Sequence, residues 1–355
     1  MRRLAICVAV AALCGAAGAA DGPEFKFSGF GTVGAVKTDT DEAQYRANLR
    51  QNKGADKSVD FGVDSLLGLQ GDVKFNDTFS AVGQLLTSRR DGSDGPVIEW
   101  LYGQAQLPAG FKLKLGRMVL PTFMISDSRS VGYAAHWLRA PADVYGLYPS
   151  SSFDGGQLQY GTTLGAVNLT AQLSAGTAKS KLFVNNAYME LKAPRLLSLN
   201  LVAEAGNWSM RLGQTQAYDS EVEGLAPKTR DTFSGIGAQY DNGTLLVMSE
   251  YATRRQGNSF FESDSWYASA GWRFGAWMPY ATVSRYTPKG LFFMGAPDNK
   301  LTAVGLRWDL MKNVALKFQA DAVRNGTVNF LSSSPSFLAS PPTVHVYSVA
   351  ADFVF

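Results

Sequence analysis

The chain has 355 residues, of which 46% are hydrophobic, 18% charged and 12% aromatic, and its mean hydropathy is −0.07. Its net charge of +3, from 33 basic and 30 acidic residues, is too balanced for a nucleic-acid binder that must neutralise many phosphates. Two histidines and two cysteines offer little to a metal site or to imidazole catalysis, and the many aromatic residues exclude a disordered chain.

Residues 1–20 have the three parts of a secretory signal peptide. Arg2 and Arg3 precede an apolar stretch over 4–13, and the segment ends in small residues. The apolar stretch is shorter than the roughly 20 residues that a membrane-spanning helix requires. We therefore predict that this segment is cleaved at its end, which removes both cysteines. Residues 21–355 are expected to form a single domain without disulfides.

Beyond the signal peptide, apolar and polar residues alternate with a period of two. Over 59–75 one parity is mostly apolar and the other mostly polar or charged, and the same division recurs over 167–174 and 314–322. This period is typical of β-strands with two different faces. No later segment has the run of about 18 apolar residues that indicates a membrane-spanning helix. A closed β-barrel, however, crosses a bilayer with alternating strands.

Short and long connections alternate between these strands. Seven short turns, such as Asp241-Asn242-Gly243, carry residues that tolerate the positive φ of tight hairpins, and eight longer connections lie between them. This order predicts an all-β, transmembrane, antiparallel β-barrel of sixteen strands with both termini on the short-turn side. The predicted strands are 24–36, 59–75, 79–89, 97–107, 111–118, 155–162, 166–175, 196–204, 208–216, 231–240, 244–254, 264–274, 277–286, 300–309, 314–324 and 344–355.

The fourth long connection leaves the strand count open. Two β-like runs, 182–191 and 196–204, lie on either side of Pro194, and counting both as spanning strands would give seventeen. An odd number would place the termini on opposite sides of the membrane. We therefore assign 182–192 to the fourth long loop or to an extension above the membrane.

The chain ends on a predicted strand whose apolar parity includes Phe353 and Phe355. A terminal aromatic on such a strand resembles the assembly signal of bacterial outer-membrane barrels. Together with Phe-Ser-Gly-Phe-Gly at 27–31, the hairpin over 67–82 and Leu-Gly-Arg at 115–117, it resembles a Gram-negative porin of the general-diffusion superfamily.

The resemblance implies a barrel in the bacterial outer membrane, usually a homotrimer, whose third long loop folds inward to narrow the pore. It implies a water-filled channel for the passive diffusion of small hydrophilic solutes and ions. It also implies contacts with the barrel-assembly machinery and with outer-membrane lipid. The charged loop tips, such as Arg46, Arg50 and Lys53 in the first loop, are expected to contact anionic lipopolysaccharide. The sequence contains no cofactor, metal or nucleic-acid-binding motif.

A charged side chain facing lipid at mid-membrane costs about 2 to 4 kcal/mol, so the charged parity of each strand is expected to line the lumen. Arg117 departs from this pattern because it shares parity with Leu113 and Leu115. A bulge at Gly116 would turn it inward. The predicted pore-wall residues are Asp64, Gln70, Gln84, Arg90, Gln104, Lys112, Arg117, Arg211, Glu250, Arg254, Arg273, Arg307, Lys317 and Asp321.

The third long connection, 119–153, is too long for a passive link and is the predicted constriction loop. We expect its Asp127 and Asp143 to face wall arginines, and its Arg129 and Arg139 to fix the loop through ion pairs. The wall arginines are Arg90, Arg117 and Arg211. Opposed charges would create a transverse field that orients dipolar solutes. In the alternative interpretation, these charges only solvate a surface loop. Because more inward candidates are basic than acidic, a weak preference for anions is expected.

Two other function classes remain open. A substrate-specific channel for sugars, phosphate or organic acids would line its lumen with aromatic residues, such as Trp100, Tyr102 and Tyr133, or with the arginines. A barrel-based enzyme would have to use His136 or His345, the only histidines, and neither lies in a recognisable catalytic motif. We therefore expect no enzymatic activity.

Overall fold

The structure is a computed structural model that describes residues 22–146, 150–184, 186–291, 294–326, 329–332, 334, 336–337 and 340–355. The predicted signal peptide over 1–20 lies outside the described residues. Within the described ranges, no helix is long and apolar enough to cross a membrane.

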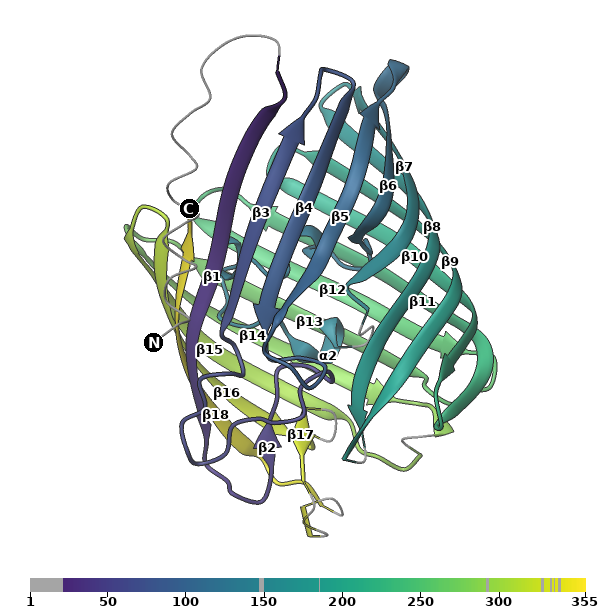
Figure 1. The fold of residues 1–355 in the computed structure, drawn as a ribbon. Helices are drawn as coiled ribbons and strands as arrows, with labels where there is room; N and C mark the ends of the chain where they lie inside the picture. The colour runs from purple at the N-terminus through teal and green to yellow at the C-terminus, as the bar shows by residue number, and fades with distance from the viewer. Residues whose placement is uncertain are drawn as a thin grey trace, which may run out of the picture.

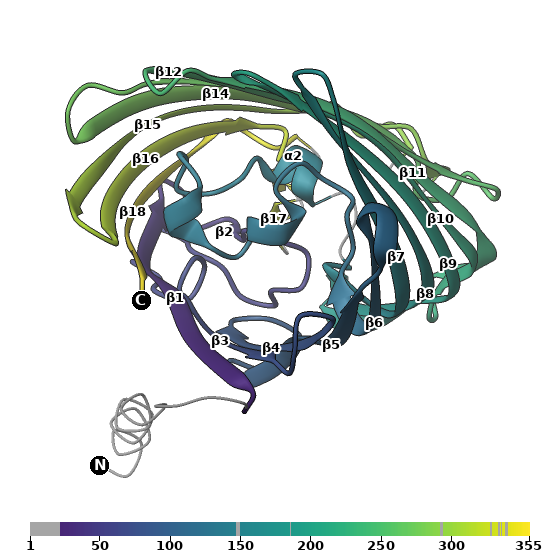
Figure 2. The same ribbon diagram turned by 90° about the horizontal axis from the view of Figure 1, so that it is seen from above.

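Sixteen of the described strands form one closed antiparallel barrel, which confirms the predicted fold (Figures 1 and 2). Neighbours in the chain are neighbours in the barrel, and β18 closes the ring against β1. Closure pairs the backbone groups of every strand, as hydrocarbon requires. The barrel strands are β1 (Glu24–Thr38), β3 (Leu66–Lys74), β4 (Phe79–Ser88), β5 (Pro96–Gln106), β6 (Phe111–Val119), β7 (Ser152–Leu164), β8 (Val167–Val184), β9 (Ala187–Ala205), β10 (Trp208–Val222), β11 (Ala226–Asp241), β12 (Leu245–Gln256), β13 (Ser263–Trp272), β14 (Trp277–Pro288), β15 (Asn299–Met311), β16 (Val314–Arg324) and β18 (Val344–Val354).

Apolar side chains cover the outside of the barrel and polar ones fill much of its inside. On β10, Met210 and Leu212 are exposed on the outer face, whereas Arg211 and Thr215 are buried on the inner face. A strand whose apolar and polar residues alternate can present an apolar face to the outside of the barrel and a polar face to its inside. The near-zero mean hydropathy of the chain is therefore compatible with an apolar outer surface.

The barrel wall has an uneven height. Strands β8 and β9 have 18 and 19 residues, whereas β3 and β4 have 9 and 10. Residues 182–192, left open by the sequence, form the far end of the β8–β9 hairpin, so the extension is the correct interpretation and the loop is not. The predicted loop over 217–230 is likewise mostly strand, because β10 and β11 continue to Val222 and from Ala226.

The second barrel strand is shorter than predicted. Residues 59–65 belong to the first loop, where a carboxylate oxygen of Asp60 accepts hydrogen bonds from the backbone N–H groups of Gly62 and Val63, at 2.7 and 3.1 Å. This local turn competes with strand pairing, although the alternation of residue types continues through it. The alternation of apolar and polar residues therefore begins before the strand itself begins.

The seam between the first and last strands is packed by aromatic rings over glycines. Gly31 lies opposite Phe353, and Gly29 exchanges two backbone hydrogen bonds of 2.9 Å with Phe355. A Cβ atom at either glycine would overlap the phenyl ring of its partner. The space beside these glycines is thus filled by the chain's own terminal rings.

Candidate pore and constriction

The third loop, residues 120–151, turns into the barrel between β6 and β7. Figure 2 shows the segment that carries α2 (Ala142–Tyr145) inside the ring of strands. Two short 3₁₀ turns, η3 (Ser126–Ser128) and η4 (Gly132–Ala134), belong to the same segment. The loop therefore has the inward position that the sequence predicts.

Three predicted pore-wall cations hold this loop through its backbone. Arg211 Nη2 donates to the Pro121 carbonyl at 2.6 Å. Arg307 Nη1 donates to the carbonyls of Tyr133 and Ala135, both at 2.7 Å. Lys317 Nζ donates to the carbonyls of Gly132 and Trp137, at 2.6 and 2.9 Å. These side chains point inward but lie under the loop, so their role is to anchor it.

Two predicted acidic residues also serve as anchors. Glu250 accepts hydrogen bonds from the backbone N–H of Met124 and the hydroxyl of Tyr267, both at 2.9 Å. Asp143 accepts hydrogen bonds from Ser284 Oγ at 2.6 Å and from Asn299. The structure therefore places Asp143 against uncharged partners of β14 and β15, and not opposite an arginine as the sequence-based hypothesis had it.

Arg139 ties the third loop to three other parts of the molecule. Its guanidinium pairs with Asp64 at 2.8 Å and with Asp321 at 3.2 Å. It also donates to the Tyr45 hydroxyl at 3.2 Å and to Ser348 Oγ at 3.1 Å. Arg139 thus connects the loop to the first loop, β16 and β18.

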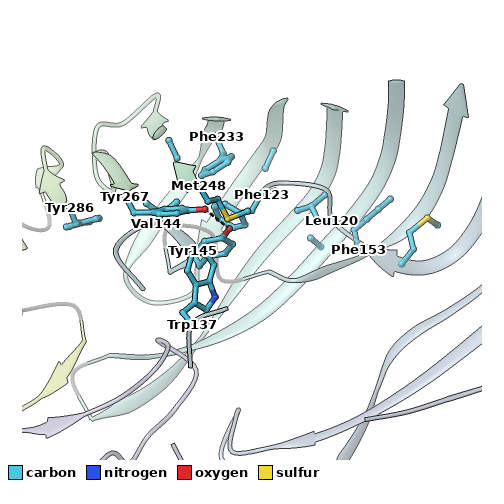
Figure 3. Close-up of a cluster of buried hydrophobic side chains, with 14 of the residues drawn as sticks. Leu120, Phe123, Trp137, Val144, Tyr145, Phe153, Phe233, Met248, Tyr267 and Tyr286 are labelled. Atoms are coloured by element: carbon cyan, nitrogen blue, oxygen red, sulfur yellow. Dashed lines mark hydrogen bonds between the residues drawn. The ribbon is translucent and has the colours of Figure 1, made fainter. Parts of the chain in front are cut away.

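An apolar cluster completes the attachment of the loop (Figure 3). From the loop come Phe123, Trp137 and Tyr145, and from the wall come Phe233 and Tyr267. The rings of Trp137 and Tyr267 meet edge to face at 5.5 Å, and those of Phe123 and Phe233 at 5.2 Å. Such pairs add about 0.5 to 1.5 kcal/mol beyond the burial of their area. Through this cluster the loop is therefore packed against β11 and β13.

A cavity of about 210 Å³ lies between the third loop, the first loop and the inner wall of β3–β5. Its lining contains more basic than acidic side chains. The only acidic side chains among its lining residues are Asp64, paired with Arg139, and Glu99, paired with Arg90 at 2.7 Å. The lining arginines are Arg50, Arg89, Arg90, Arg129 and Arg139.

Arg129 differs from the other arginines of this cavity. It donates to the Tyr145 carbonyl at 2.9 Å and lies over the rings of Phe123 and Tyr145. No acidic side chain forms an ion pair with it within the described part of the chain. Its predicted role of fixing the loop through an ion pair is thus replaced by a hydrogen bond within the loop, and its charge is not neutralised.

A smaller space lies next to this cavity. This second space, of only about 20 Å³, shares Glu99, Arg129, Ser130 and Ser151 with the first and is also lined by Trp100. A space must have about 10 to 15 Å³ to hold one water molecule, so this space has room for about one. We take this space, between the third loop with Asp127 and the wall around Gln84 and Trp100, as the candidate narrowing of the pore.

Part of the inner wall is rich in side-chain amides. Gln84 Nε2 donates to Gln70 at 2.9 Å, and Asn200 Nδ2 donates to Gln172 at 2.8 Å. Lys112 alternates with the apolar residues of β6 and therefore shares the inward face with these amides. Such a wall offers donors and acceptors to hydrated solutes without a strong field.

The other predicted wall residues have different places. Arg254 is buried against Asp231, and Arg273 pairs with Asp241 at 2.6 Å near a short turn. Arg117 lies on the outer face, where it pairs with Asp154 at 2.8 Å. Its neighbours on that face, Leu101 and Leu115, are 56% and 58% exposed, so Gly116, with a φ of 132°, does not turn Arg117 inward.

The two histidines lie outside the cavities. His136 Nε2 is 2.7 Å from Ser269 Oγ, but both side chains are buried between the loop and the wall. His345 contacts Asp39 at 2.7 Å on the outside of the barrel end. Within the described ranges, no three His, Cys, Asp or Glu side chains gather as a metal site would require.

The sequence did not predict that the first loop (39–65) crosses the open end of the barrel. Its short strand β2 (Gln44–Tyr45) pairs with β17 (Phe330–Leu331) of the last loop. Arg46 Nη1 donates to the Phe183 carbonyl at 2.7 Å, and the Phe183 N–H donates to the Leu49 carbonyl at 2.8 Å. Residues 44–51, here called the finger, thus reach from the β1 side to the β8–β9 hairpin.

Arg46 holds the finger from a buried position. Its side chain is buried, and this burial lowers the pKa of its guanidinium to about 10. On the neighbouring side, Arg50 pairs with Asp91 of the second loop. No local sequence signal marks these contacts, because each joins residues far apart in the chain.

Comparisons with known proteins agree with this architecture. The family model for Gram-negative porins matches residues 5–327. The chain belongs to the Gram-negative porin family. As a porin, it is a channel of the outer membrane for passive diffusion.

Solved structures share the fold of this porin at low sequence identity. The anion-selective porin from Comamonas acidovorans has a TM-score of 0.62 and 14% identity, over 94% of this chain and 100% of that chain. OmpT, an outer membrane protein of Vibrio cholerae, has a TM-score of 0.61 and 12% identity, over 95% and 99%. Salmonella typhi OmpF, in complex with daunomycin, has a TM-score of 0.61 and 14% identity, over 94% and 98%. A search of curated protein sequences found no match.

Proposed function

We propose that this porin passes small hydrophilic solutes with a preference for anions. The observation that carries the proposal is the 210 Å³ cavity, because it is lined by five arginines and one of them, Arg129, has no carboxylate partner among the described residues. A confined space with low-dielectric walls concentrates the field of such charges and raises the local concentration of counter-ions. The similar fold of the anion-selective Comamonas porin supports the same assignment.

Arg129 is proposed as the main determinant of this preference. It lines both the cavity and the narrowing, and no ion pair within the described residues cancels its charge. Arg50, Arg89 and Arg90 each have a carboxylate partner, so their contribution to the field is smaller.

The test is the reversal potential of single channels in a planar bilayer with unequal KCl concentrations on its two sides. The reversal potential of the wild-type channel should be shifted from zero towards the equilibrium potential of chloride. Arg129→Gln should lower the chloride-to-potassium permeability ratio by about twofold or more. Arg255→Gln removes a positive charge of the outer face, paired with Asp264, and should leave the ratio unchanged. Cation selectivity in wild-type protein would refute the proposal.

A second candidate is a channel specific for small organic acids. The observation that favours it is the narrowing of about 20 Å³ beside Arg129, because a tight basic passage selects among anions by size and shape. In single-channel records, a dicarboxylate such as succinate would then cause brief blocks at millimolar concentrations. Unblocked currents in succinate would leave general diffusion of anions as the function.

We further infer export, assembly and partners that fit this function. Residues 1–20 would be removed as a signal peptide, leaving 21–355 as one barrel domain, and Phe353 and Phe355 would be read by the barrel-assembly machinery. A homotrimer is supported by a similar solved structure described as the trimer form of OmpT from Vibrio cholerae. Mass spectrometry of the mature N-terminus and of the intact oligomer tests these assignments.

The protein is proposed to be a channel and not a barrel-based enzyme. The pair of His136 and Ser269 is buried under the third loop and lines neither cavity. A hydrolase would require that pair to be accessible to substrate. Ester hydrolysis by purified protein that disappears in Ser269→Ala would contradict this assignment.

A further inference from the structure

The finger crosses the loop end of the barrel from one side of the ring to the other. Its chain leaves β1, and its tip contacts Phe183 at the end of β8. In the closed ring, β3 to β7 separate β1 from β8 on one side, and β9 to β16 with β18 separate them on the other. Figure 1 shows β2 and β17 at the loop end of the barrel, and Figure 2 shows them within the outline of the ring. The finger therefore lies across the outer opening and not along its rim.

The finger is the tip of a closed hairpin. At its base, Tyr45 and Ala55 exchange backbone hydrogen bonds of 2.7 and 2.8 Å. The side chain of Gln51 is buried, accepts a hydrogen bond from the N–H of Ala47 at 2.9 Å and donates to the Val63 carbonyl at 2.8 Å. A buried polar side chain that is satisfied in this way makes the backbone around it rigid. The finger therefore has a defined shape of its own.

Several other parts of the loop end hold the finger in place, besides the contact with β8. In the second loop, the N–H of Asp91 donates to the Arg50 carbonyl at 3.0 Å, and the carboxylate of Asp91 accepts from Arg50 Nε at 3.0 Å. The third loop contributes the hydrogen bond from Arg139 to the Tyr45 hydroxyl, and the last loop contributes the pairing of β17 with β2. Because these attachments come from different sides of the ring, the finger cannot swing aside without breaking several of them.

The finger also forms one side of the basic cavity. Residues 47–51 line this cavity of about 210 Å³ together with Arg129 of the third loop. Arg129 lines the candidate narrowing as well, but none of residues 44–51 does. The cavity therefore lies between two separate obstacles, which are the finger and the narrowing at the third loop.

We propose that the finger is an outer size filter, which a solute passes before it reaches the narrowing at the third loop. Pore width decides which solutes can pass, and the long loops of such barrels lie on the external side. Two obstacles in series limit the flux together, so that opening one leaves the other in control of large solutes. The inference rests on the proposed function, because an obstacle across the opening matters only where solutes pass.

The first test removes the tip of the finger. Deleting residues 47–50 keeps the pair of Tyr45 and Ala55 and leaves 46 and 51–54 between them, a length that hairpin loops accept. The single-channel conductance in KCl should rise by about 1.5-fold or more. In liposome swelling, the deletion combined with Trp100→Ala should admit a neutral trisaccharide that neither change admits alone. Heat-dependent mobility on gels checks that each variant is folded.

The second test narrows the opening and keeps the length of the chain. Both cysteines lie within residues 1–20, so a protein refolded from residue 21 onward has no thiol of its own. A large neutral methanethiosulfonate reagent on Ala47→Cys should lower the conductance, and a reductant should restore it. The control is Val59→Cys, in the same loop, because Val59 lines a pocket with the outward residues Phe318 and Val349. Its labelling, verified by mass, should leave the conductance unchanged.

Other outcomes overturn the proposal. Unchanged conductance and solute size in the folded deletion variant would place the finger beside the solute path. Wild-type currents in labelled Ala47→Cys would do the same, and this holds even where the deletion variant fails to fold. Equal loss of current in labelled Val59→Cys would mean that the reagent acts on the barrel as a whole. Neutral sugars test the filter independently of charge, so cation selectivity in wild type would refute the proposed function and not this inference.

Discussion

Replacing Arg139 with alanine should loosen the third loop on one side of the pore. Arg139 is the shared partner of Asp64 and Asp321, whose side chains are 7% and 0% exposed. Removing one partner of a buried pair typically costs about 3 to 5 kcal/mol, because a charge is left buried without its counter-ion. At 1.36 kcal/mol per tenfold change, the population with a detached loop rises by about 10²- to 10⁴-fold.

The assay is single-channel recording of Arg139→Ala beside two controls. The variant should show larger and noisier currents than wild type, and a lower unfolding temperature. Arg195→Ala breaks the exposed pair with Asp219 and should cost less than about 1 kcal/mol, with currents unchanged. The neutral triple variant Asp64→Asn, Arg139→Gln, Asp321→Asn should restore quiet currents. Currents and stability of Arg139→Ala equal to those of Arg195→Ala would refute the reasoning.

Three further predictions address the seam, the finger and the narrowing. Gly31→Val should reduce the fraction that folds, as seen by heat-dependent mobility on gels, and adding Phe353→Ala should restore it; no rescue would mean that the ring does not cause the defect. Arg46→Ala should speed proteolytic cleavage within 44–51, because the finger loses its donor to the Phe183 carbonyl; an unchanged cleavage rate would show that other contacts hold it. Trp100→Ala should raise conductance and admit larger solutes in liposome swelling, whereas unchanged permeability would place the narrowing elsewhere.

The barrel could be predicted from the sequence because its signals are local. Alternation of residue types and the chemistry of short turns depend on near neighbours, and lipid enforces both. The ends of the strands were less predictable, because beyond the membrane the same alternation is compatible with a strand, as in 182–191, or with a loop, as in 59–65.

The site could be predicted only in part, for the same reason. Parity placed Lys317 and Arg307 on the inner face, but the path of the third loop decides that they bind carbonyls and do not face water. The alternation along β6 also places Arg117 on the same face as outward leucines, and in the structure Arg117 does face outward. The prediction that a bulge at Gly116 turns Arg117 inward was wrong. The partners of Asp143 come from β14 and β15, more than 100 residues away in the chain, and no local pattern encodes them.

The hydrogen bonds from Arg211, Arg307 and Lys317 to main-chain carbonyls have a consequence for how selectivity can change. A carbonyl is the same whichever side chain its residue carries, so these bonds depend on the course of the loop and not on its composition. Substitutions at loop positions that face the solute path, such as Arg129, therefore leave these hydrogen bonds intact. Ion selectivity can thus change, in evolution or by engineering, while the third loop stays attached to the wall in the same way.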